Sequence, residues 1–131
     1  MKNSTILFSC LFALVSIIGF SCKKEAEEII FTEVEYGILD IDESIVSITY
    51  IDASGNPVVI DDLSQFVNGS KKISVSTKPF TARLELLINN TTNNEKSYTL
   101  GILVNGDVVA IKPVYCPSSG MALGEVEFTI Q

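Results

Sequence analysis

The chain has 131 residues, 47% of them hydrophobic, and its 16 acidic and nine basic residues give a net charge of −7. This acidic balance argues against nucleic-acid binding, because the phosphate backbone repels an acidic surface. The chain has no histidine, which excludes Ser-His-Asp and Cys-His catalytic sites and histidine-rich metal clusters. We therefore expect a non-enzymatic protein without a cofactor or a metal.

The N-terminal segment, residues 1–21, is typical of a signal peptide. One lysine, Lys2, is followed by an apolar run from Ile6 to Ile18, about 13 residues long, whereas a membrane span needs roughly 20. The run closes with Gly19-Phe20-Ser21-Cys22. Cleavage before Cys22 would leave a thiol that can carry a diacylglyceryl group.

The sequence Gly19-Phe20-Ser21-Cys22 resembles the relaxed lipobox of Bacteroidota lipoproteins. The resemblance implies that Cys22 is the lipidated first residue of the mature chain. The alternatives are an N-terminal membrane anchor, or ordinary cleavage with Cys22 as a structural thiol.

The segment 22–30 is expected to be an acidic, solvated tether, because Lys23-Lys24-Glu25-Ala26-Glu27-Glu28 has no periodic apolar face. In Bacteroidota lipoproteins a lysine followed by acidic residues looks like an export signal to the outer face of the outer membrane. An anchor facing the periplasm stays open. We expect a membrane contact only through the lipid.

The remaining residues, 31–131, are expected to form one all-β domain. Apolar residues alternate with polar ones, which is the period of a half-buried strand. The clearest example is 45–51, in which Val46, Ile48 and Tyr50 are expected on one face. Gly37 is a place for a bulge or a close backbone approach. Strands are predicted within 33–38, 45–51, 58–60, 72–77, 81–88, 97–104, 108–112 and 124–130.

Turn residues separate these strands. Asn105-Gly106 favours a type I′ hairpin turn, and Gly55 or Asn56 is expected to take a positive φ. Pro57 and Pro113 place their strands toward sheet edges. Residues 61–67 are predicted to form one helical turn capped by Asp61 or Asp62, or a crossover. About seven to eight short strands with such turns predict a two-sheet antiparallel β-sandwich, immunoglobulin-like or similar.

Two hairpin segments carry a second resemblance. Ile48-Thr49-Tyr50-Ile51-Asp52-Ala53-Ser54-Gly55, followed later by Ile102-Leu103-Val104-Asn105-Gly106-Asp107-Val108-Val109, is similar to the MmpS-like β-sandwich. That domain occurs in small mycobacterial membrane proteins that accompany lipid exporters and in Bacteroidota lipoproteins. The resemblance implies the fold over about residues 33–130 and leaves the role open.

Candidate binding residues are few. Tyr115 and Phe66 are expected in loops, where an aromatic ring can contact a carbohydrate or peptide. The acidic groups Asp40/Asp42/Glu43 and Asp61/Asp62 are read as solvated loops, with Ca²⁺ binding as the alternative.

Only one cysteine of the expected domain is left after the signal peptide and the lipidation site. This residue, Cys116, has no partner for a disulfide within the domain. It is read as a small buried hydrophobe, with a reactive thiol as the alternative.

These observations lead to an expected function. We expect a monomeric, lipid-anchored outer-membrane lipoprotein, on the cell surface or the periplasmic face. It would act as an interaction or accessory module that contacts an unknown envelope protein or glycan. The alternative is a surface glycan- or ligand-binding lipoprotein of a nutrient-uptake system.

Overall fold

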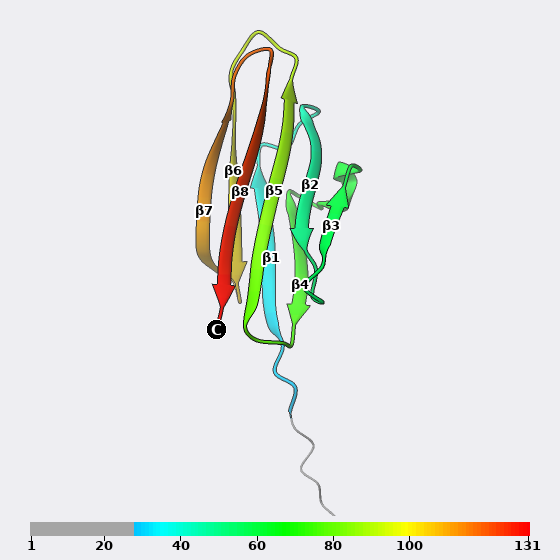
Figure 1. Ribbon diagram of the computed structural model, residues 1–131, viewed down its shortest axis with the longest axis vertical. Helices are drawn as coiled ribbons and strands as arrows, with labels where there is room; N and C mark the ends of the chain where they lie inside the picture. The colour runs from blue at the N-terminus through cyan, green and yellow to red at the C-terminus, as the bar shows by residue number, and fades with distance from the viewer. Residues whose placement is uncertain (1–27) are drawn as a thin grey trace, which may run out of the picture.

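The computed structural model describes residues 28–131, so the predicted signal peptide and Cys22 lie outside the described residues. The described chain forms eight β-strands and one short 3₁₀ helix, and it contains no α-helix (Figure 1). The elements are β1 Thr32–Leu39, β2 Ile45–Ile51, β3 Pro57–Ile60, η1 Leu63–Gln65, β4 Ser70–Val75, β5 Phe80–Asn90, β6 Lys96–Val104, β7 Asp107–Cys116 and β8 Gly120–Ile130.

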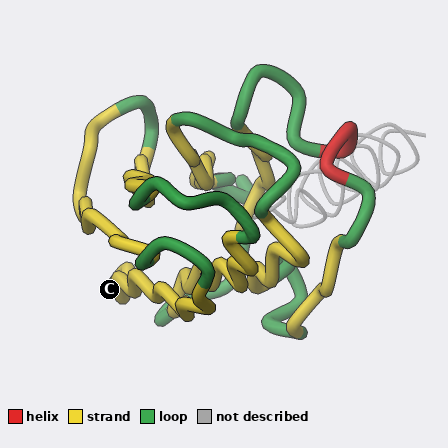
Figure 2. The backbone as a smooth tube through the Cα atoms, turned by 90° about the horizontal axis from the view of Figure 1, so that it is seen from above, coloured by secondary structure: helices red, strands yellow, loops and turns green. Residues whose placement is uncertain are grey.

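The strands make two four-stranded sheets, which confirms the predicted β-sandwich. Sheet A has the order β4-β1-β6-β7, sheet B has the order β3-β2-β5-β8, and all neighbours are antiparallel. Only the hairpins β2–β3 and β6–β7 stay within one sheet, while the other connections pass between the sheets. Figure 2 shows the two layers from above, with η1 at the periphery.

The core lies between the sheets, where every second residue of a strand points inward. The strands β1, β5 and β6 show this alternation along most of their length. Their inward side chains agree with the sequence pattern and dominate the buried set. The fully buried members on these strands include Val34, Tyr36, Leu84, Leu86, Ile88, Tyr98, Leu100 and Ile102.

One predicted face is wrong, in β2. Val46 was expected beside Ile48 and Tyr50, but it is exposed, and Ile45 is buried in its place. The cause is a β-bulge, since the pairing with β5 shifts register between Ile45 and Ser47. An extra residue in a strand reverses the alternation on one side of it.

The structure also lengthens the last two strands. Residues 115–121 were expected to form a loop, but β7 continues to Cys116 and β8 begins at Gly120. Pro113 does not end β7, because β7 is an edge strand. Proline has no backbone N–H, and on the free side of an edge strand no neighbouring strand needs that donor.

The predicted turns are confirmed. Asn105 and Gly106 have φ values of 50° and 86°, as a type I′ turn requires, and Gly55 has φ 85°. The Asp62 side chain accepts from the Ser64 backbone and caps η1. Pro57 begins β3, which is an edge strand of sheet B.

The two ends of the sandwich differ in what they carry. The described chain enters β1 at the end where the C-terminus also lies, while the β5–β6 loop and the β7–β8 turn lie at the opposite end (Figure 1). Asn90 organises that opposite end: its buried amide donates to the carbonyls of Asn94 (2.7 Å) and Pro117 (3.0 Å). A domain tethered through its N-terminus would therefore present these loops away from the tether.

Candidate functional site

The two aromatic candidates, Phe66 and Tyr115, differ in their exposure to solvent. Phe66 is only 4% exposed and packs edge-on against Tyr50, with ring centroids 6.3 Å apart, so its prediction as a loop contact residue is wrong. The physical reason is η1, because this capped turn directs the residue after it into the core. Tyr115 lies on β7 instead of in a loop, and its ring is 73% exposed.

The acidic residues form no cation site among residues 28–131, where no three acidic or cysteine side chains gather closely enough to hold a metal. Asp62 caps η1. The Asp42 carboxylate is occupied by protein groups, since it accepts from Lys96 Nζ (2.6 Å) and from the Tyr98 hydroxyl (2.8 Å).

This Asp42 network ties the loop between β1 and β2 to β6. Partial burial raises the pKa of Asp42, but hydrogen bonds from Lys96, Tyr98 and the Ser44 backbone outweigh it and leave the pKa below its usual range. Burial, followed by the hydrogen bond to Asp42, raises the pKa of Tyr98. The phenol therefore stays a donor.

Lys96 also lies 2.6 Å from the Ser44 hydroxyl, an arrangement that in outline matches a serine–lysine nucleophile pair. A lysine that activates a serine must accept its proton. Lys96 instead donates to both Ser44 and Asp42. We interpret the cluster as a structural tie.

Cys116 is buried, and its thiol contacts the Gly120 carbonyl oxygen at 3.4 Å. This placement matches the prediction of a small buried hydrophobe. A thiol withdrawn from solvent is not placed for reaction with a substrate.

The most distinctive surface lies on the outer face of sheet A and has two glycines as its floor. Gly37 of β1 and Gly101 of β6 are direct cross-strand partners, in register without a bulge. Neither has a positive φ. A Cβ atom built on Gly37 would meet nothing within 4 Å, and one on Gly101 would meet only the Ala110 carbonyl at 3.8 Å. Neither the backbone nor the packing therefore requires glycine at these two positions.

Apolar side chains surround this floor. Together they enclose a hollow of about 180 Å³, which we call the sheet A hollow. Two of the residues that line it are largely exposed to solvent, Leu39 at 62% and Ile111 at 66%. Its lining consists of Gly37, Leu39, Thr99, Gly101, Leu103, Val108 and Ile111.

The neighbouring surface extends this apolar character. Ile111, Pro113 and Tyr115 alternate with inward residues of β7, so Tyr115 shares the outer face with the hollow. A contiguous exposed apolar surface on a small domain marks a contact site more often than a scattered one does. The predicted bulge or close backbone approach at Gly37 is wrong, because Gly37 pairs in register and a Cβ atom there would meet nothing within 4 Å. The pairing with Gly101 was not predicted from the sequence.

Comparison with known proteins adds no family: no protein-family model matches the chain, and no curated protein is similar to it. Within residues 28–131, no helix has the length and apolar character that crossing a membrane requires.

Proposed function

We propose that this protein is a lipid-anchored lipoprotein of the bacterial cell envelope, a non-enzymatic interaction module whose contact surface is the sheet A hollow. Cys22 is the proposed lipidation site, on the strength of its resemblance to a lipobox. The observation that carries the contact surface is the Gly37–Gly101 pair. Glycine within a strand weakens it by roughly 0.5–1 kcal/mol relative to alanine, so two unforced glycines side by side suggest a use for the open space.

The hollow suits an apolar protein segment better than a sugar. Apart from Thr99, its lining is aliphatic or glycine, whereas a sugar needs several polar partners for its hydroxyl groups. A side chain such as leucine, placed over Gly37 and Gly101, would bury both itself and Ile111. Burial of apolar surface contributes about 25 cal/mol per Å².

The rim of the hollow indicates the charge of the partner. Asp40 follows Leu39 and Asp107 precedes Val108, whereas Glu35, across from Leu103, is already paired with Lys72 of β4 at 3.7 Å. We therefore propose a partner surface with an apolar centre and basic residues around it.

Self-association of the domain is opposed by charge. Residues 28–131 contain 14 acidic and six basic residues, so two copies with net charges of −8 would repel each other. This supports the proposed monomer.

The anchor is tested by growth with radiolabelled palmitate, comparing the wild type with Cys22→Ser. We expect label on the wild type and none on the variant. An unlabelled wild type would refute the lipid anchor. Protease treatment of intact cells then distinguishes a surface location, in which the domain is cut, from a periplasmic one, in which it is protected.

The contact surface is tested by site-specific photocrosslinking in producing cells. A photoreactive amino acid at position 111 is expected to yield one defined adduct, and Gly37→Val in the same chain is expected to abolish it by filling the hollow. The control position is Val59, which is similarly exposed but lies on sheet B. An adduct that persists with the hollow filled would place the contact elsewhere.

One observation favours the alternative of a glycan- or ligand-binding lipoprotein of a nutrient-uptake system. Tyr115 presents an exposed ring on the same face as the hollow, and aromatic faces stack on sugar rings. A glycan-array signal that Tyr115→Ala abolishes would support this function. The result of the photocrosslinking experiment does not depend on whether the protein binds a glycan.

We also retain the MmpS-like assignment as a proposal. The two segments that carry the resemblance lie within the hairpins β2–β3 and β6–β7. The hairpins lie in different sheets, so they form separate parts of the sandwich.

A further inference from the structure

Sheet B opens at the end of the sandwich where the chain enters. The pairing of β5 with β8 continues to Phe80 and Ile130, whereas the pairing of β5 with β2 ends at Leu84 and Tyr50. Among residues 28–131, the first residues of β5 therefore have a neighbouring strand on one side only.

A tyrosine from the other sheet closes the beginning of this opening. The buried Tyr36 hydroxyl donates to the Ile51 carbonyl oxygen at 2.7 Å. In this way the hydroxyl supplies the Ile51 carbonyl with a donor that a regular ladder would take from β5. The Asn89 N–H of β5 bonds the Ser44 carbonyl oxygen just before β2 (2.8 Å), so Arg83, an even number of residues away, also directs its N–H and C=O toward β2.

The next backbone groups along β5 have no such substitute. Residues two apart in a strand direct their N–H and C=O to the same side, so Thr81 also faces the opening. There β2 has already turned away, because the Asp52 N–H bonds the Asn56 carbonyl within the β2–β3 turn (2.8 Å). Within residues 28–131, no strand pairs with Thr81 on that side.

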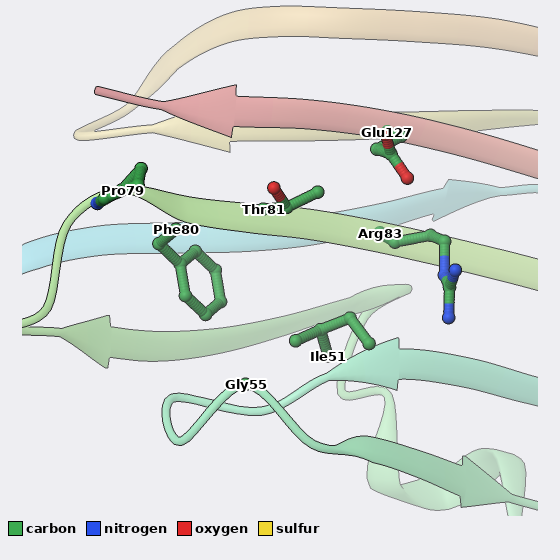
Figure 3. A pocket seen from close by; sticks show the side chains of 7 residues that line it. All are labelled: Ile51, Gly55, Pro79, Phe80, Thr81, Arg83 and Glu127. Carbon is green, nitrogen blue, oxygen red and sulfur yellow. The ribbon is translucent and has the colours of Figure 1, made fainter.

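A pocket of about 280 Å³ occupies the opening. Figure 3 shows Phe80 and Ile51 projecting into the space between the start of β5 and the turn that holds Gly55. Both side chains are nearly buried and apolar. The volume lies below the roughly 300–1,000 Å³ of pockets for drug-sized ligands, so the pocket has room for a small group such as one side chain.

The charges around the pocket do not favour an anion. Arg83 is the basic residue of the lining, and its Nε already lies 3.3 Å from Glu85. Glu127, the cross-strand partner of Arg83 on β8, lines the same pocket. A neutral ligand with its own donor and acceptor fits this balance best.

We propose that this pocket binds an extended peptide segment, whose main chain pairs with the N–H and C=O of Thr81 and whose apolar side chain, on the same sheet face as Thr81, rests on Ile51. Such a ligand continues sheet B where β2 leaves it, in the manner of strand addition. The site lies on the opposite sheet from the sheet A hollow and does not depend on the proposed function.

The test uses the full chain, labelled with ¹⁵N, and a minimal ligand of this chemistry, N-acetyl-L-leucine N′-methylamide. The expected result is a saturable change in the amide shifts of Thr81 and Gly55, with a dissociation constant in the millimolar range that is typical of so small a ligand. The matched control ligand carries an ester oxygen in place of the leucine N–H, and so lacks the donor for the Thr81 carbonyl.

The control ligand is expected to bind at least about fivefold more weakly, which is the effect of one lost hydrogen bond of about 1 kcal/mol. Absence of saturable shifts with the amide, or saturable shifts confined to the sheet A hollow, would overturn the site. Equal binding of the amide and the ester would overturn the main-chain pairing. Because both comparisons use the wild-type chain, no outcome depends on whether a variant folds.

Discussion

Replacing Gly37 by alanine should make the protein more stable while it removes the space that we assign to a partner. Gly37 has no positive φ, and its added Cβ would meet nothing within 4 Å. Alanine in place of a strand glycine restricts the unfolded chain, which is worth about 0.5–1 kcal/mol. For a domain of this size, that corresponds to a rise of roughly 2–8 °C in the melting temperature.

A matched control is provided by Gly124 of β8. A Cβ atom there would overlap the Val114 side chain of β7, because the two strands approach closely at this corner. Gly124→Ala is therefore expected to destabilise the protein by about 1–3 kcal/mol, the usual effect of overpacking. The same substitution, glycine to alanine, should thus raise the free energy of unfolding at Gly37 and lower it at Gly124.

The assay is urea denaturation followed by circular dichroism, with thermal melting as a second measurement. If Gly37→Ala is more stable than the wild type and also fails to form the photocrosslinked adduct at position 111, then glycine lowers the stability at this position but is needed for contact with the partner. If Gly37→Ala destabilises the protein by 1 kcal/mol or more, glycine is structurally required there, and the argument for the sheet A hollow fails.

Three further outcomes are expected. Tyr36→Phe should lower the free energy of unfolding in urea by about 1–3 kcal/mol, because it leaves the Ile51 carbonyl without its buried donor. Tyr115→Phe on the surface should change it by less than about 0.5 kcal/mol. Asp42 has a lowered pKa, so its carboxylate stabilises the fold above pH 3.8, its usual pKa, and this contribution disappears as the pH falls through the folded-state pKa. The melting temperatures of wild type and Asp42→Asn should therefore differ most near pH 7 and converge in acid; a constant gap would contradict this. Cys116 should react with a thiol reagent only in urea, and rapid labelling of the native protein would show that it is accessible.

Local chemistry was enough to predict the strands and most of their turns. The alternation in β5, with Ala82, Leu84 and Leu86 facing inward, overrode the helical preference of its alanine, leucine and glutamate residues. Asn105-Gly106 forms its predicted turn because two successive positive φ angles suit these residue types. Such features depend on neighbours in the chain, which the sequence displays directly.

The tertiary structure decided the features that depend on distant neighbours. Phe66 lies in a loop, as predicted, but the short helix before it directs its ring onto Tyr50, where it is buried instead of exposed. Val46 moved to the outside because a bulge, which exists only relative to a partner strand, reversed the alternation of β2.

The candidate sites belong to the same category. A period of two assigns side chains to two faces of a strand, but it does not say which strands are neighbours or where a ladder ends. By itself, the sequence determined an all-β domain with alternating inward residues. Only strand pairing placed Gly37 beside Gly101 and left Thr81 without a strand partner on one side in the described part of the chain, because contacts between residues far apart in the chain are set by how the two sheets assemble.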